Sequence, residues 1–79
     1  MTQSSWNGLY NINWCHGKVE GGFYTVSAAI DAILEEFPAA FEEKLSNSER
    51  WNVYESGEAF KAGEKPIAQV TRMNEFPIF

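Results

Sequence analysis

The feature that most constrains the fold is a single apolar stripe near the middle of the chain. Apolar side chains recur there at the spacing of one helical face, at Val26, Ile30, Ile33, Leu34 and Phe37. A hydroxyl at Thr25 or Ser27 can cap such a helix by accepting a hydrogen bond from a backbone N–H group of its first turn. Pro38 disfavours helical geometry at the residue before it, so we expect the helix to end near Phe37.

The segment before this helix has the pattern of a β-hairpin. Residues 9–15 alternate between apolar and polar side chains, as a half-buried strand does. His16 and Gly17 predict a two-residue turn, because glycine accepts the positive φ that a tight hairpin needs. Residues 18–24 are then expected to return as a second strand. The glycine pair at 21–22 weakens that strand and indicates either a bulge or a loop that leads into the helix.

A second, short helix is predicted directly after the first. Proline is well tolerated in the first turn of a helix, and Pro38 stands at the start of this segment. Phe41 and Leu45 are four residues apart and would share one helical face. Residues 38–45 are therefore predicted to be helical after a kink.

The last third of the chain returns to strand patterning. Alternation predicts strands at residues 50–55 and 67–73, whereas residues 58–62 fit no pattern and are expected only to be anchored by Phe60. The predicted order is ββααββ or βααββ. This order favours the α+β class, with a small antiparallel sheet of three to four strands and one longer and one short helix packed on one face.

The chain has 79 residues, which suffices for one domain, 1–79, with residues 1–6 and 74–79 as flexible or docked tails. Cys15 is its single cysteine, so no internal disulfide can form and stability must come from a compact core. Large aromatic side chains are expected to fill that core, at Trp6, Tyr10, Trp14, Phe23, Tyr24, Phe37, Phe41, Trp51, Tyr54 and Phe60. The lone thiol and the lack of a signal-peptide pattern indicate the cytoplasm.

Charge limits the range of partners. The chain carries 11 acidic and 6 basic residues, a net charge of −5, and its lysines and arginines are scattered singly. Nucleic acids and anionic membranes are bound by clustered cations, so direct binding to either is not expected. A basic protein partner is the better expectation, and a homodimer is compatible with the sequence.

Cys15 and His16 are the one place where two common catalytic or ligating residue types meet. Neighbouring residues on a strand point to opposite faces, so the thiol and the imidazole are not expected to bond to each other. A zinc site would need two further ligands of this kind, which the chain lacks. We therefore expect a buried thiol beside a turn histidine. No metal site, cofactor site or catalytic residue is predicted, and the chain is not expected to be an enzyme.

Acidic residues between positions 31 and 49 form the main candidate for a functional surface. Six carboxylates fall in these nineteen residues against one cation, Lys44. Such a helix sacrifices some stability to like-charge repulsion and can present a negative surface to a basic groove. Exposed aromatic side chains are expected to contribute anchors. The predicted partner-binding residues are Asp31, Glu35, Glu36, Glu42, Glu43, Glu49, Trp6 and Tyr54, and the tail at 76–79 either docks on the sheet or serves as another anchor.

In size, acidity and α+β order, the chain is similar to the small inhibitor proteins that phages and mobile elements use against host enzymes, including the anti-CRISPR group. That resemblance implies an inhibitor or regulator that occupies a basic, nucleic-acid-binding site on a partner protein. Two alternatives remain at this point. One is a structural subunit that self-associates through its apolar tail, and the other is a small enzyme that uses Cys15 or a carboxylate.

Overall fold

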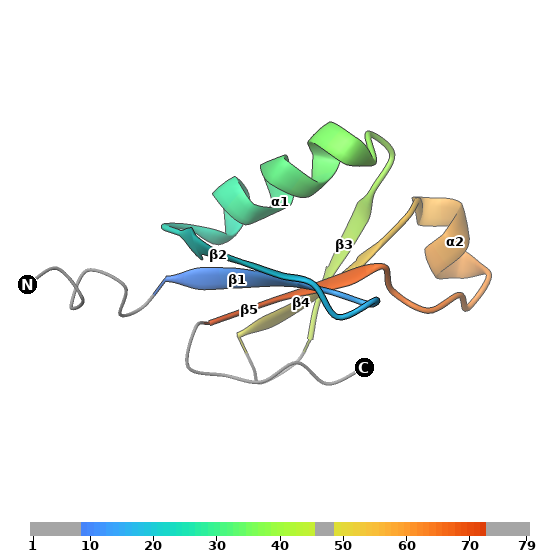
Figure 1. Cartoon of the computed structure of the whole chain (residues 1–79). Coiled ribbons are helices and arrows are strands. Elements are labelled where there is room, and N and C mark those ends of the chain that lie inside the picture. Colours follow the sequence, from blue (N-terminus) through green and yellow to red (C-terminus); the bar gives the residue numbers. More distant parts are fainter. Residues whose placement is uncertain (1–8, 46–48, 73–79) are drawn as a thin grey trace, which may run out of the picture.

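In the computed structural model, which describes residues 9–45 and 49–72, a five-stranded antiparallel sheet carries two helices (Figure 1). The elements in chain order are β1 (Tyr10–Trp14), β2 (Val19–Phe23), α1 (Val26–Glu36), β3 (Phe41–Lys44), β4 (Arg50–Tyr54), α2 (Gly57–Lys61) and β5 (Ala68–Arg72). The strands lie side by side in the order β2-β1-β5-β4-β3. The α+β class is confirmed, but the described residues form five strands rather than three to four, in the order ββαββαβ.

The first two strands form the predicted hairpin, with a loop one residue longer than expected. The Gly17 N–H donates to the Trp14 carbonyl at 2.9 Å, and the Trp14 N–H donates to the Lys18 carbonyl at 2.8 Å. Residues 15–17 therefore make a three-residue loop. Its last residue, Gly17, has a φ of 103°, which confirms the expected role of this glycine.

The glycine pair in β2 forms a bulge. Tyr10 pairs with Phe23 and Ile12 pairs with Glu20, so β2 has one more residue than β1 over this stretch. A Cβ atom on Gly21 would lie 2.5 Å from the Asn11 Oδ1 atom, which is closer than real Cβ contacts. A side chain at position 21 would therefore displace the Asn11 side chain. Of the two sequence-based alternatives, the bulge is the one observed.

The apolar stripe forms α1 as predicted. Thr25 is the cap, and its hydroxyl accepts a hydrogen bond from the Ala28 N–H at 3.0 Å. The helix ends at Glu36, and it buries Ala29, Ile30 and Ile33 against one face of the sheet. Apolar side chains from three strands complete this core, at Ile12, Trp14, Val53, Ala68 and Val70.

Aromatic side chains contribute less to the core than the sequence predicts. The fully buried apolar side chains are aliphatic, whereas Tyr24 is 74% exposed and Phe41 is 38% exposed. Tyr24 follows the last residue of β2 and precedes the helix cap, so it lies beyond the sheet. The core between α1 and the sheet is therefore mainly aliphatic, with Trp14 as its buried aromatic side chain among the described residues.

The helix predicted for residues 38–45 is wrong. Pro38 instead follows Phe37 in a turn, in which the Ala40 N–H donates to the Phe37 carbonyl at 2.9 Å. The chain then enters β3, which pairs with β4 so that Phe41 lies opposite Tyr54. Alanine, glutamate and lysine are good helix formers, but such intrinsic preferences are small and the ladder with β4 overrides them.

The unassigned stretch of the sequence forms α2, which packs through Phe60. The Ser56 hydroxyl caps this helix by accepting from the Ala59 N–H at 3.1 Å. The Phe60 ring lies 4.8 Å from the Phe41 ring and 5.0 Å from the Tyr54 ring, between centroids. Tyr54 points away from α1, since its neighbour Val53 belongs to the core under α1. The two helices therefore do not share one face of the sheet.

Polar side chains occupy the sheet face opposite α1. Asn13, Gln69 and Thr71 are buried there, and their side chains are joined to neighbouring strands by hydrogen bonds. The Asn13 Nδ2 atom donates to Thr71 Oγ1 at 2.9 Å, and the Gln69 Nε2 atom donates to Asn52 Oδ1 at 2.7 Å. These bonds offset the loss of hydration that burial imposes on polar groups. The predicted tails, 1–6 and 74–79, lie outside the described residues.

Candidate functional site

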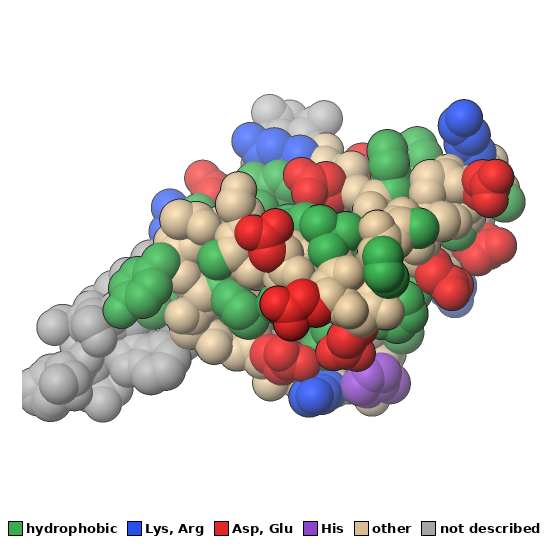
Figure 2. All heavy atoms as spheres, turned by 90° about the horizontal axis from the view of Figure 1, so that it is seen from above, with side chains coloured by type: hydrophobic (Ala, Val, Ile, Leu, Met, Phe, Trp, Pro, Cys, Tyr) green, Lys and Arg blue, Asp and Glu red, His purple; other side chains and the backbone are tan. Residues whose placement is uncertain are grey.

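Three carboxylates stand on the outer face of α1. Asp31, Glu35 and Glu36 are all exposed and lie away from the buried stripe, as predicted. Figure 2, which views the molecule from the α1 side, shows acidic side chains gathered over the middle of this face and lysine and arginine side chains toward its rim. We call Asp31, Glu35 and Glu36 the acidic helix face.

The position of these carboxylates is unfavourable for the helix itself. Asp31 and Glu35 are four residues apart and repel each other. Glu35 and Glu36 lie in the last turn, where the helix dipole is negative, and no basic residue accompanies them there. Each negative charge at this end of a helix lowers the stability by about 0.3 to 1 kcal/mol at low ionic strength. Helix stability therefore does not explain why acidic residues occupy this face.

The other predicted carboxylates do not all join this face. Lys44 lies over the Trp51 ring on the α1 side of the sheet, so Glu42, two residues away on β3, is exposed on that same side. Glu43 is half-buried on the opposite side and accepts a hydrogen bond from the Tyr54 hydroxyl at 3.1 Å. The acidic run is thus divided between the two faces of the edge strand.

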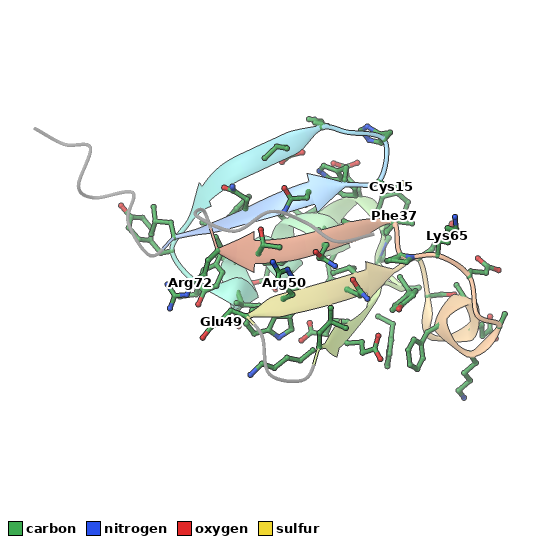
Figure 3. All side chains as sticks on the ribbon, turned by 90° about the horizontal axis from the view of Figure 1, so that it is seen from below. Cys15, Phe37, Glu49, Arg50, Lys65 and Arg72 are labelled. Carbon is green, nitrogen blue, oxygen red and sulfur yellow. The ribbon has the colours of Figure 1, made fainter. Side chains whose placement is uncertain are left out.

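Glu49 belongs to a different part of the molecule. Its carboxylate accepts a hydrogen bond from the Tyr10 hydroxyl at 3.2 Å and lies 3.6 Å from the Arg72 Nε atom. Figure 3 shows Glu49 and Arg72 at one end of the sheet, and Cys15 and Phe37 at the other end. Glu49 is therefore separated from the last turn of α1 by the length of the strands.

Of the predicted aromatic anchors, Tyr54 is the one that lies in the described residues, and it is not exposed. Tyr54 is only 8% exposed, so the expectation that it would be uncovered is wrong. Phe60 of α2 covers its ring, and burial raises the pKa of the Tyr54 phenol, with the hydrogen bond to Glu43 adding to the rise. Trp6 and the tail at 76–79 lie outside the described residues.

Cys15 and His16 also differ from their predicted arrangement. Both residues belong to the hairpin loop rather than to a strand, so the alternation rule does not separate them. Cys15 is exposed, not buried as expected. The two side chains line the same hollow, of about 170 Å³, and the His16 ring stacks on Trp14 with an interplanar angle of 7°. Within the described ranges, no group of three or more histidine, cysteine or acidic residues could hold a metal ion.

Glu20 is a site residue that the sequence analysis missed. It lines the same hollow as Glu36, and its carboxylate accepts a hydrogen bond from Trp14 Nε1 at 3.0 Å. The Lys18 Nζ atom lies 3.2 Å from the same Glu20 oxygen. The signal was present in the hairpin, because a three-residue loop pairs Glu20 with Ile12 and so places it on the α1 side. A two-residue turn gives a different register.

A second, more open depression extends the acidic surface past the end of α1. It is lined by Glu36, Glu55 and the Phe37–Ala39 turn, with Ser56 at its edge. Glu55, which follows β4, is exposed. Carboxylates from β2, from α1 and from the end of β4 therefore surround the last turn of α1. Converging charges of one sign raise the local concentration of ions of the opposite sign.

The fold and the site together define a small α+β domain with an acidic helix face and no recognisable catalytic arrangement in the part of the chain described. A comparison of the sequence and the structure with protein-family models, with curated proteins and with solved structures finds no match. Neither α1 nor α2, the helices of the described residues, is long and apolar enough to cross a membrane.

Proposed function

We propose that this domain is a protein-binding module that engages a basic partner through the acidic helix face, with Glu42 at its margin. The observation that carries the proposal is the placement of Asp31, Glu35 and Glu36. All three are exposed, Glu35 and Glu36 lie at the negative end of the helix without a basic residue in its last turn, and Asp31 repels Glu35. Residues that weaken their own element are expected where binding, rather than folding, determines the side chain.

A basic, nucleic-acid-binding site is the partner surface that best complements such a face. Sites of that kind present clustered lysine and arginine side chains to phosphates, and a rigid row of carboxylates can compete for them. The module would then act as an inhibitor or regulator, in the manner of the phage and mobile-element inhibitors that it resembles in size and acidity. No catalytic step is required for this role.

A pull-down from a lysate of the source cells tests the proposal. The wild type is compared with Asp31→Asn/Glu35→Gln and with the matched control Glu58→Gln/Glu64→Gln, whose exposed carboxylates lie on and after α2. We expect a basic partner to be retained at low salt and lost at high salt. The helix-face variant should lose most of this partner, whereas the control should keep it.

Kinetics with the partner so identified complete the test. Exposed charges mainly steer the encounter, so the helix-face variant should lower the association rate constant and flatten its dependence on salt. Equal binding by the wild type and the Asp31→Asn/Glu35→Gln variant, with the same salt dependence, would show that the acidic helix face is not the binding surface.

A further inference from the structure

The hollow beyond the last turn of α1 combines aromatic walls with carboxylates. Trp14, Phe37 and His16 form the aromatic part, with the Trp14 and Phe37 ring centroids 6.0 Å apart and the His16 ring stacked on Trp14 at 6.3 Å. Glu20 and Glu36 approach from β2 and from α1, and their carboxylates are the acidic groups of its lining. Aromatic faces together with carboxylates form a suitable environment for an organic cation.

The electrostatics of the hollow favour positive charge. Glu36 makes no hydrogen bond or ion pair with any residue in 9–45 or 49–72. It also stands at the negative end of α1, whose last carbonyl groups add a partial negative charge. The indole of Trp14 holds the Glu20 carboxylate in place through the bond from Nε1. An additional cation could therefore bind between the Glu36 carboxylate, which has no partner among these residues, and the Glu20 carboxylate, which Trp14 already orients.

The size of the hollow restricts what can bind. Pockets for drug-sized ligands enclose roughly 300 to 1,000 Å³. The volume of about 170 Å³ is smaller and suits one side chain. Arginine fits better than lysine, because its planar guanidinium stacks on aromatic rings and binds a carboxylate through two parallel hydrogen bonds.

We propose that this hollow binds an arginine side chain of the basic protein partner. The proposal rests on the proposed function and adds a specific contact to it. Lys18 is the intramolecular competitor, because its ammonium group pairs with Glu20 at the rim while its side chain remains 60% exposed. An exposed pair of this kind contributes little and is readily exchanged for another cation. The arginine of the partner would take over the contact with Glu20 and add a contact with Glu36.

The test uses N-acetyl-arginine N-methylamide as a probe and needs no partner protein. Its titration is followed by NMR through the Trp14 indole resonance and the backbone amides of residues 15–18. N-acetyl-norleucine N-methylamide, which lacks the charge, is the matched control ligand. We expect saturable shifts at these positions with the arginine probe alone. Free arginine derivatives are weak ligands, so saturation is expected only at millimolar concentration.

Four variants assign the site. Glu36→Gln and Glu20→Gln should each weaken the probe about fivefold, the upper range for one partly exposed ion pair. Lys18→Gln should strengthen binding, because the competing ammonium is gone. Glu58→Gln, on α2, should leave the affinity unchanged. Glu58→Gln changes the net charge as much as Glu36→Gln and Glu20→Gln do, so a loss of affinity in those two variants alone separates occupancy of the hollow from a general effect of net charge.

Alkylation of Cys15 gives a second readout, since this thiol lines the hollow and is the single cysteine of the chain. The arginine probe should slow its reaction with iodoacetamide, a neutral reagent, and the norleucine control should not. Probe shifts confined to the Asp31 and Glu35 amides, or no shift at residues 14–18, would overturn the arginine site. Either result leaves the helix-face variants of the pull-down free to succeed or fail independently.

Discussion

The phenol of Tyr54 is buried against Phe60 and hydrogen-bonded to Glu43. Burial and the hydrogen bond to Glu43 raise the pKa of its phenol above 10.0 in the folded protein. The neutral phenol is thus favoured by folding, and its contribution to stability is fully present below pH 10 and lost as the pH rises through the higher, folded-state pKa. We expect the free energy of unfolding to fall above about pH 10, and Tyr54→Phe should reduce that fall.

Urea denaturation between neutral and alkaline pH measures this effect. At neutral pH, Tyr54→Phe should lower stability by about 1 kcal/mol, because the bond to Glu43 is removed. Tyr24→Phe is the control, since the Tyr24 ring is 74% exposed. Identical alkaline transitions in the wild type and in Tyr54→Phe would contradict the assignment of the raised pKa to this phenol.

For single residues, the sequence predicts the face of the sheet on which a side chain lies but not the contacts that it makes there. Alternation correctly places Tyr54 on the face opposite Val53, but it says nothing about what covers that face. Phe60 covers it, and this contact depends on a short helix whose pattern is too brief to recognise. Cys15 was expected to be buried because its strand was extended by one residue, whereas a loop residue is free to be exposed.

At the scale of one element, the charges of α1 provide a test that is independent of any partner. Glu35 and Glu36 oppose the helix dipole, and Asp31 repels Glu35. Glu35→Gln/Glu36→Gln should therefore raise the free energy of unfolding by about 0.5 to 1 kcal/mol at low ionic strength. The gain should shrink at high salt, because ions screen exposed charges.

Urea denaturation at two salt concentrations measures the gain, with Glu58→Gln as the control. Glu58 lies in the first turn of α2, where a negative charge is favourable, so its neutralisation should not stabilise the protein. A helix variant that is no more stable than the wild type would mean that the carboxylates of α1 find compensation elsewhere. The argument from their placement would then lose its basis.

The elements differ in how well the sequence predicted them. Residues 26–36 were predicted correctly because period, cap and proline agree, and the hairpin followed from alternation and one glycine. β3 was assigned to a helix because Pro38 is well tolerated in a first turn and Phe41 and Leu45 are four residues apart, whereas the strand state of β3 depends on its pairing with β4. For the candidate site, the sequence correctly predicts that Asp31, Glu35 and Glu36 lie away from the buried face of α1. It does not predict that Glu20 lies on the α1 side of the sheet, because that position depends on the register of the hairpin.

For the whole molecule, the two edge strands of the sheet, β2 and β3, determine whether two copies can associate edge to edge. At β2, the bulge at 21–22 interrupts the regular ladder that a second strand would need. At β3, an antiparallel pairing of two copies in full register sets Glu42 opposite Glu43 of the second copy. Like charges directly opposite each other destabilise a sheet, and the net charge of −5 adds to the repulsion.

We therefore expect a monomer at neutral pH over a wide concentration range, measured by sedimentation equilibrium. Glu42→Gln/Glu43→Gln should promote self-association through β3, because it removes the opposed charges while a glutamine oxygen can still accept from Tyr54. Glu58→Gln/Glu64→Gln changes the net charge equally but leaves this edge intact, so it should remain monomeric. Association of both variants to the same extent would trace repulsion to net charge alone, and a wild-type dimer would show that the carboxylates of β3 do not protect the sheet.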